Sequence, residues 1–186
     1  AAQWFSRTET LWKDILRLDA AHTMVVTRSG PTLNRYWAPD LQASLSFRSD
    51  QECAEHYRAL LFDVVHRLSR SNQPIACEVS GGLDSSAIFA VAETLRRQDQ
   101  LPAPALEGYT LNFSGEPDAD EIDYCRSVGA HLGRQIYEVP PAHFLLSWYQ
   151  DTARNFFDFP EFPNGAMGLP IADLARANGS RVLLNG

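Results

Sequence analysis

The chain has 186 residues, of which 45% are hydrophobic, and its formal net charge at pH 7 is -7. A chain of this length and composition can bury one substantial core. The negative charge, with no run of Lys or Arg to offset it, disfavours nucleic-acid phosphate as a partner. No apolar stretch approaches the roughly 18 residues of a membrane span, and no secretory leader is recognisable. We therefore expect a cytoplasmic protein that binds neither nucleic acid nor membrane.

The cysteines and histidines form no metal-binding pattern. Cys53, Cys77 and Cys125 are far apart, and each falls on an apolar face or strand, which predicts buried and reduced thiols. The five histidines are scattered, without an H-E-x-x-H or paired-His spacing. We interpret the histidines as structural or surface residues.

The segment before residue 49 is predicted to form small elements that are too few to hold a core alone. An amphipathic pattern predicts a helix over residues 8–18. Residues 22–28 and 32–37 are typical of the two strands of a hairpin, joined by a Ser-Gly-Pro turn. A polar linker then runs to about Ser49.

From Ser49 onward, helical and extended patterns alternate. Ser49 and Glu52 form a capping box at the start of a helix that ends before Ser71, and Asp118 and Glu121 form a second one. The later elements are predicted as strand 75–79, helix 85–97, strand 107–113, a helix from the second box to Leu132, strand 134–139, and then helix 142–155, helix 170–177 and strand 181–185. This alternation predicts right-handed crossovers and a parallel sheet with helices on both faces.

The stretch Ser80-Gly-Gly-Leu-Asp-Ser-Ser86 follows the first of these apolar strands and leads into a helix. Its small residues let backbone N–H groups converge on an anion, and the helix adds its positive dipole end. The absence of Lys-Ser/Thr after the glycines, and of G-x-G-x-x-G, excludes the two commoner phosphate loops. Asp84 beside phosphate makes sense only as a ligand to Mg²⁺. The alternative is an ordinary Gly-Gly turn with Asp84 or Ser85 as helix N-cap.

This stretch resembles the pyrophosphate loop (PP-loop) of the ATP pyrophosphatases, which split ATP between the α and β phosphates and adenylate a substrate. The resemblance implies an α/β fold of the Rossmann-like (HUP-type) class, with ATP and Mg²⁺ as ligands. Asp84 would be the metal ligand. The residues expected to bind the pyrophosphate are Ser80, Gly81, Gly82, Asp84, Ser85 and Ser86.

A series of landmarks narrows the resemblance to the synthetase domain of class B asparagine synthetases, and equally to the related β-lactam synthetases and lasso-peptide cyclases. The landmarks are Arg35-Tyr-Trp37, the capped helix, the PP-loop, Asp120-Glu121 and Val182-Leu-Leu-Asn-Gly186. The resemblance implies that residues 1–48 are the tail of a preceding glutaminase-like domain with its linker. Residues 49–186 would be the N-terminal part of an ATP-binding synthetase domain.

In this family, a Gly-Asp-Glu loop and a catalytic Lys follow the strand that matches residues 181–185. Both would fall beyond Gly186. The expectation is therefore an incomplete copy of the fold, which holds no catalytic residue and is inactive alone.

The resemblance also implies an adenosine pocket formed by Glu78, Val79, Leu111, Asn185 and Gly186. Two of these depart from the family pattern. Asn185 has an amide where the family has a serine hydroxyl. Glu78 stands where an apolar residue is usual, and it could touch the ribose or pair with a basic residue outside the core.

The aromatic-rich loop of residues 156–165 is the expected wall of the acceptor pocket. Its Asp158 and Glu161 could orient an acidic or peptide substrate, although carboxylates there would repel free aspartate. Alternatively, the loop is a hydrophobic plug against the sheet with solvated acids at its rim. Asp120 and Glu121 are interpreted mainly as helix-start residues.

The resemblance implies a two-step, amide-forming ligase reaction. A substrate carboxylate attacks the α-phosphate of MgATP to give an acyl-adenylate and pyrophosphate, and an amine then displaces AMP. The expected partners are a small-molecule or peptide carboxylate and, if a glutaminase domain is present, glutamine or ammonia as amine donor. A homodimer is one of the assemblies compatible with the resemblance. The amine would instead be the peptide's own N-terminus in a lasso-peptide cyclase, or an internal nitrogen in a β-lactam synthetase.

Two readings of other classes compete with the ligase. The first is a non-catalytic nucleotide-binding module. The second, sulfur or tRNA modification by another PP-loop enzyme, is disfavoured by the acidic charge and by the lack of paired catalytic cysteines.

Overall fold

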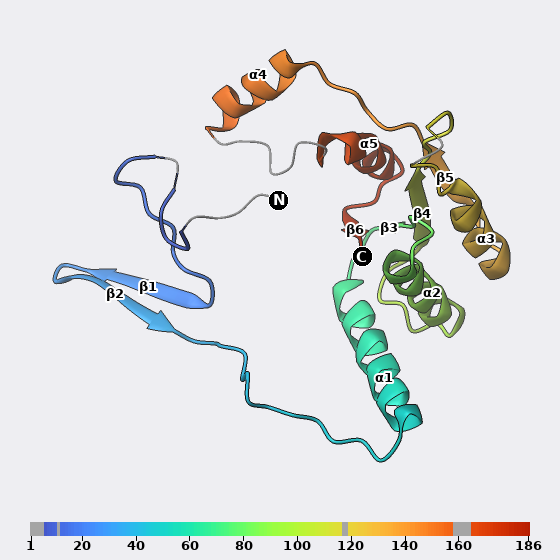
Figure 1. Cartoon of the computed structure of the whole chain (residues 1–186), viewed down its shortest axis with the longest axis horizontal. Coiled ribbons are helices and arrows are strands. Elements are labelled where there is room, and N and C mark those ends of the chain that lie inside the picture. The colour runs from blue at the N-terminus through green and yellow to red at the C-terminus, as the bar shows by residue number, and fades with distance from the viewer. Residues whose placement is uncertain (1–5, 11, 117–118, 158–164) are drawn as a thin grey trace.

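A computed structural model describes residues 6–10, 12–116, 119–157 and 165–186 of the chain. From residue 50 onward, helices alternate with four strands of one parallel sheet, whose order is β5-β4-β3-β6 (Figure 1). The predicted α/β class and the parallel sheet are therefore confirmed. In chain order the elements are α1 (Asp50–Leu68), β3 (Ile75–Glu78), α2 (Leu83–Arg97), β4 (Leu106–Leu111), α3 (Ile122–Leu132), β5 (Ile136–Val139), α4 (Leu146–Phe156), the 3-10 helix η1 (Gly165–Gly168), α5 (Leu169–Ala177) and β6 (Val182–Leu184).

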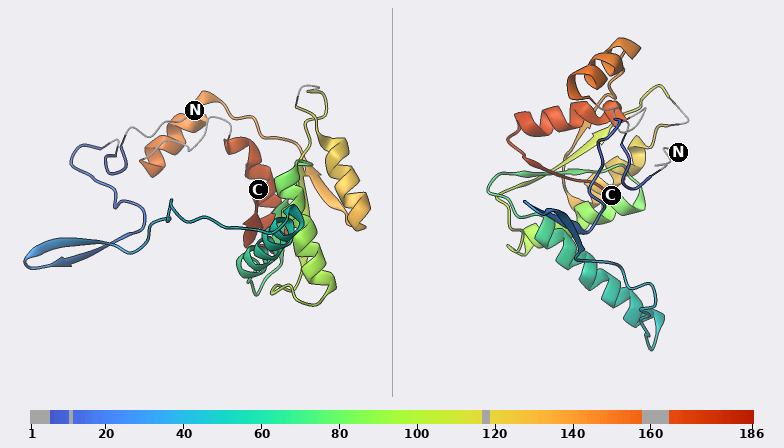
Figure 2. Two further views of the ribbon diagram at one scale, coloured as in Figure 1. Left: turned by 60° about the horizontal axis from the view of Figure 1, so that its bottom comes forward. Right: turned by 90° about the vertical axis from the view of Figure 1, so that its left-hand side faces the viewer.

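The sheet buries apolar side chains on both of its faces. Along β3, Ile75 and Cys77 belong to a buried cluster that includes residues of α1, α2 and α3. Ala76, between them in sequence, belongs to a second cluster with Tyr109 and residues of α5. This alternation follows from the two-residue period of a strand, and it places helices on opposite sides of the sheet (Figure 2).

Helix α1 begins as its capping box predicts. The Ser49 hydroxyl accepts a hydrogen bond from the backbone N–H of Glu52 at 3.2 Å. The Glu52 carboxylate accepts from the backbone N–H of Arg48 at 2.7 Å, one residue before the position that the usual box uses.

The starts of several other elements differ from the prediction. Helix α3 begins at Ile122. Its N-cap is Glu121, whose side chain makes no capping bond, and Asp118 of the predicted second capping box lies outside the described residues. Instead the Asp120 carboxylate accepts from the backbone N–H of Ile122 at 3.1 Å, which supports its role as a helix-start residue. Helix α4 begins only at Leu146, four residues later than expected after the Pro-Pro pair.

The N-terminal segment contains the predicted hairpin, formed by β1 (His22–Thr27) and β2 (Gly30–Arg35), which pair antiparallel. The hairpin stands apart from the parallel sheet (Figure 1). The helix predicted over residues 8–18 is wrong for the described part of that range. Glu9 and Leu16 form an isolated antiparallel bridge, and the Thr10 hydroxyl donates to the carbonyl of Ile15 at 2.6 Å.

Two causes explain the missing helix. The Thr10 hydroxyl satisfies backbone groups locally, which competes with helix formation. The apolar residues of the pattern also have no core to cover, since Ile15 and Leu16 are 57% and 71% exposed. An amphipathic pattern forms a stable helix mainly by burying its apolar face.

The cysteines are free, and Cys77 and Cys125 are buried as predicted. The prediction was wrong for Cys53, which is exposed because it lies in the first turn of α1, a helix whose buried residue is Val65. Among the helices that the structure describes, none combines the length and the apolar character that crossing a membrane requires.

Candidate functional site

The Ser80–Ser86 stretch joins the carboxyl end of β3 to α2, at the point where the strand order reverses. The chain runs from β3 through β4 to β5, and then returns to place β6 on the other side of β3 (Figure 1). In open parallel sheets, ligands bind at the carboxyl ends of the strands beside such a reversal. The end of β6 brings Asn185 and Gly186 to the same place.

Gly81 lets this loop lie directly on α3. Its φ is +88°, a conformation that side chains disfavour. A Cβ built on it would lie 2.8 Å from the Cβ of Tyr124 and 2.9 Å from the backbone nitrogen of Cys125. Only glycine fits between the loop and α3 without a shift of one of them.

Gly186 makes a similar approach from the other side. A Cβ built on it would lie 2.6 Å from the backbone nitrogen of Ser85 and 3.0 Å from the carbonyl carbon of Asp84. The second residue after β6 thus lies against the first turn of α2. Two segments that the sequence analysis placed in one site are therefore in contact.

The hydroxyls of the loop have different surroundings. Ser85 is buried, and its Oγ accepts from the backbone N–H of Ser80 at 3.0 Å and bonds Ser80 Oγ at 2.8 Å. Ser80 is exposed, and its Oγ accepts from the backbone N–H of Gly82 at 3.2 Å. Ser86 Oγ is buried and has no hydrogen-bond partner among the described residues. Ser85 therefore fixes the shape of the loop, while Ser80 faces solvent.

The first turn of α2 is left without a side-chain cap. The N-cap is Gly82, in an extended conformation, so neither Asp84 nor Ser85 has the capping role of the ordinary-turn alternative. Asp84 lies in the first turn and is exposed. Because the first N–H groups of a helix have no partner inside it, this turn offers donors and a positive dipole end to an anion.

The other expected adenosine positions lie at the same edge of the sheet. Glu78 ends β3 and is half-buried, and its carboxylate has no hydrogen bond or ion pair with any described residue, so the expected basic partner is not found there. The Val79 side chain is fully buried, and its backbone N–H donates to the carbonyl of Tyr109 at 2.7 Å. Leu111 ends β4, the strand beside β3, and is half-buried. Asn185 is exposed.

The two acidic residues expected in the acceptor pocket, Asp158 and Glu161, lie outside the described residues. Just before them, Phe157 accepts a hydrogen bond on its carbonyl from Trp12 Nε1 at 2.9 Å. No three His, Cys, Asp or Glu side chains lie close enough to hold a metal ion in the part of the chain that the structure describes.

A hydrogen-bonded cluster near the loop was missed by the sequence analysis. Glu138 on β5 accepts from Arg126 on α3 at 2.7 and 2.8 Å, and from Asn112 Nδ2 at 2.8 Å. The Arg126 guanidinium lowers the pKa of the Glu138 carboxyl. These residues come from separate elements, so no local motif could have grouped them.

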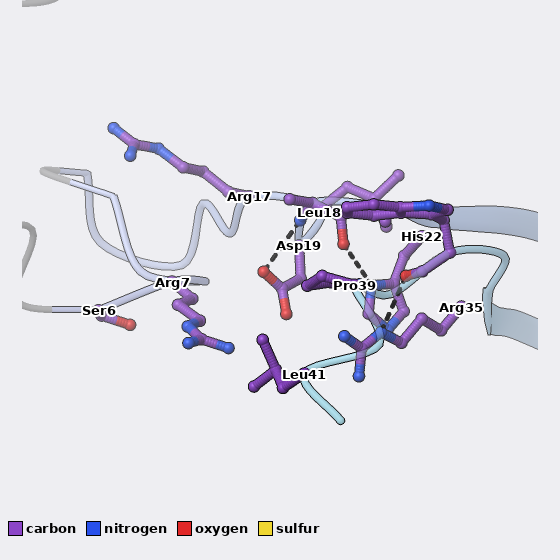
Figure 3. A pocket seen from close by; sticks show the side chains of 12 residues that line it. Ser6, Arg7, Arg17, Leu18, Asp19, His22, Arg35, Pro39 and Leu41 are labelled. Atoms are coloured by element: carbon purple, nitrogen blue, oxygen red, sulfur yellow. Dashed lines mark hydrogen bonds between the residues drawn. The ribbon is translucent and has the colours of Figure 1, made fainter. Parts of the chain in front are cut away.

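A hollow of about 800 Å³ lies in the N-terminal segment and not at the loop (Figure 3). Its charged walls are Arg7, Arg17, Asp19 and Arg35. All of its lining residues fall within residues 6–41, so it is separate from the Ser80–Ser86 site.

Comparison with known proteins agrees with the geometry. The family model described as asparagine synthase matches residues 56–186. Amidase chyE of Penicillium rubens is 25% identical over 196 residues, which cover 98% of this chain and 29% of the relative. The glutamine-hydrolyzing asparagine synthetase 3 of Bacillus subtilis is 33% identical over 82 residues, covering 44% of this chain and 13% of the relative. A glutamine-hydrolyzing asparagine synthetase of Gallus gallus is 32% identical over 82 residues, covering 44% and 14%.

The chain thus spans less than a third of the length of these curated relatives. The family match nevertheless covers well over half of this chain, and it includes β3, the Ser80–Ser86 loop, α2 and β6. By this match and by its parallel α/β architecture, the chain belongs to the asparagine synthase family.

Proposed function

We propose that this chain is the ATP-binding part of a ligase that joins a carboxylate to an amine. The observation that carries the proposal is the meeting of the PP-loop, the uncapped first turn of α2 and Gly186 at the strand-order reversal. These groups provide backbone donors and a positive helix end in one small area. The family match makes ATP-dependent amide formation the chemistry that suits this area best.

The residues present fit a nucleotide phosphate and Mg²⁺. Gly81 and Gly186 let the loop and the end of the chain lie directly against α3 and the first turn of α2, and the buried Ser86 hydroxyl there has no partner among the described residues. Mg²⁺ is usually held by one or two carboxylates together with substrate phosphates and water, so a single exposed Asp84 suits it. When bound, the ion would neutralise charge on the phosphates.

In the proposed reaction, the loop acts on the leaving pyrophosphate. A substrate carboxylate attacks the α-phosphate of ATP, which gives an acyl-adenylate and releases pyrophosphate; an amine then displaces AMP. The N–H groups of the uncapped first turn of α2 and the Ser80 hydroxyl would donate to the pyrophosphate oxygens as negative charge develops. Ser85 would keep these donors in place through its bonds to Ser80. Donors fixed before the reaction are worth more than donors that must reorganise.

For the acceptor and the amine, we propose asparagine synthetase-like use of ammonia from glutamine, with residues 1–48 as the end of a glutaminase-like domain. Adenosine would lie along Glu78, Val79, Leu111, Asn185 and Gly186. A ring closure of the lasso-peptide or β-lactam kind is the second candidate, favoured by the aromatic stack of Phe144 and Trp148, whose ring centroids are 4.2 Å apart. The free thiols agree with a cytoplasmic site for the reaction.

The test is ATP–pyrophosphate exchange by the full-length protein, with aspartate and with peptide acids as carboxylates. We expect Asp84→Ala to reduce exchange at least 100-fold, a loss of the size seen when a transition-state electrostatic group is removed. The matched control is Asp63→Ala, which removes a carboxylate in an exposed ion pair on α1.

Three results separate the alternatives. Exchange that survives Asp84→Ala would exclude Asp84 as the metal ligand. ATP binding without exchange for any acid would support a nucleotide-binding module in place of a ligase. Exchange that depends on a peptide acid and not on aspartate would favour ring closure.

A further inference from the structure

The Glu138 carboxylate joins three elements at the carboxyl end of the sheet. Arg126 on α3 donates to both of its oxygens, from Nε at 2.7 Å and from a terminal nitrogen at 2.8 Å. Such a bidentate pair fixes direction as well as distance. Glu138 itself lies on β5, so the pair holds α3 to the edge strand of the sheet.

Asn112 extends this cluster into the connection between β4 and α3. Its Nδ2 donates to Glu138 at 2.8 Å, and its Oδ1 accepts from the backbone N–H of Ser114 at 2.8 Å. Its own backbone N–H donates to the carbonyl of Val139 at 2.8 Å, which continues the β4–β5 pairing past the end of β4. The carboxylate therefore also orders the first residues that follow β4.

The same stretch of α3 is in contact with the PP-loop. Arg126 directly follows Tyr124 and Cys125, the two residues that leave no room for a side chain on Gly81. Cys125 is buried and its backbone leaves no space beside Gly81, so a shift of α3 toward the loop would press on Gly81. The contact therefore transmits the position of Arg126 to Gly81.

We propose that Glu138, acting through Arg126 and Asn112, is a positioning residue that sets the conformation of the PP-loop and with it the affinity for the phosphates of the nucleotide. This inference rests on the proposed function for its kinetic readout. It assigns a role in nucleotide binding to residues that touch no expected ligand position. It predicts a specific effect on ATP, because the acceptor loop of residues 156–165 belongs to a different connection.

Steady-state exchange by the full-length protein tests this role. Glu138→Gln keeps the size of the side chain and removes its charge, and Arg126→Gln removes the partner. We expect each variant to raise the KM for ATP about 10-fold and to leave the KM for the carboxylate unchanged, as for coupled residues in one network. The double variant should raise the KM for ATP no more than either single variant does, because the Arg126–Glu138 contact is lost in all three.

The control is Asp63→Asn, which breaks the exposed Arg67–Asp63 pair on α1 and should leave both KM values unchanged. Equal changes in the two KM values, or additive losses in the double variant, would overturn the inference. A lower melting temperature with unchanged KM values would show a merely structural role and would also overturn it.

A second measurement does not need activity. Amide hydrogen exchange should become faster at residues 80–86 in Glu138→Gln than in the unchanged protein, and stay the same in Asp63→Asn. Unchanged rates at the loop would refute the positioning role even if the protein catalyses no exchange reaction. If the unchanged protein catalyses no ATP–pyrophosphate exchange, but amide exchange at residues 80–86 is faster in Glu138→Gln, the proposed function would be refuted and the positioning role supported.

Discussion

Gly81 contributes to the site because it has no side chain. Its backbone conformation and its approach to Tyr124 each exclude a side chain, so glycine lets the loop lie directly on α3. Gly115 has a similar φ, +99°, but nothing lies within 4 Å of its Cβ position. The two glycines therefore separate the cost of the backbone conformation from the cost of the close contact.

We predict that Gly81→Ala costs more stability than Gly115→Ala. Both substitutions place an L side chain at positive φ, which costs about 1–3 kcal/mol. Only Gly81→Ala adds a collision with α3, and it should also reduce ATP binding at least 10-fold. Thermal unfolding and equilibrium nucleotide binding would measure the two effects. Equal losses of stability in the two variants would show that α3 can move away from a side chain at residue 81 without a loss of free energy.

Glu93 is a buried carboxylate on α2 that is compensated by arginines. Its side chain is 1% exposed, and its oxygens accept from Arg96 at 2.7 and 2.8 Å and from Arg97 at 2.8 Å. Arg134, after α3, lies 3.6 Å away. The hydrogen bond from Arg96 is the largest cause that lowers the pKa of Glu93, ahead of Arg97 and Arg134 and against the opposing effect of burial.

We predict that Glu93→Gln lowers the free energy of unfolding by about 2–3 kcal/mol near pH 7, the usual size for hydrogen bonds to a charged group. Because the pKa is lower in the folded state, this stabilisation is present above the unfolded pKa and is lost as the pH falls through the folded pKa. The difference between the two proteins should therefore shrink below about pH 4.5. Denaturant unfolding at pH 7 and pH 3.5 would measure it; a constant difference would contradict the linkage.

At the scale of elements, predictions made from neighbouring residues succeeded at the start of α1 and failed at the starts of α3 and α4. The α1 cap depends on neighbouring residues: the Ser49 hydroxyl caps the helix as predicted, although Glu52 bonds the backbone of Arg48 in place of that of Ser49. The helix over residues 8–18 failed because its apolar face needed a surface to cover, which the pattern itself does not provide. The contact of Gly186 with Ser85 brings the end of β6 to α2 across about a hundred residues. No local sequence pattern predicts such a contact, so the expectation that these two segments share a site came from the family resemblance alone.

The uncapped first turn of α2 leads to a prediction at this scale. Inorganic pyrophosphate with Mg²⁺ should raise the melting temperature of the chain, because a ligand at 100 times its Kd stabilises by about 2.7 kcal/mol. For a chain of this size that corresponds to several degrees. Chloride at the same ionic strength is the control, and Asp84→Ala should abolish the shift. A shift that persists in Asp84→Ala would place the anion elsewhere.

At the scale of the whole molecule, the two clusters of buried residues are drawn only from residues 61–184. The hairpin of residues 22–35 stands apart from the sheet in Figure 1 and in the left view of Figure 2. The stability of the α/β part should therefore depend little on the N-terminal segment.

We predict that residues 49–186, expressed alone, unfold cooperatively within about 4 °C of the melting temperature of the whole chain, which for this size corresponds to a loss of roughly 1 kcal/mol. The Trp12–Phe157 hydrogen bond is the contact whose loss would account for a small decrease. Trp12→Phe in the whole chain, which removes the N–H donor, should reproduce that decrease. Aggregation or non-cooperative unfolding of residues 49–186 would show that the N-terminal segment is needed for the core.

The parallel pairing of β3 with β6 also has a consequence for how the protein is made. Ile75 pairs with Val182, so the two strands are separated by about a hundred residues, and closing so long a loop slows folding. During synthesis, the PP-loop leaves the ribosome long before the strand that completes its edge of the sheet. The nucleotide would then meet the loop together with Gly186 only after β6 has paired with β3, and ATP in the cell would favour that step over the partly folded forms before it.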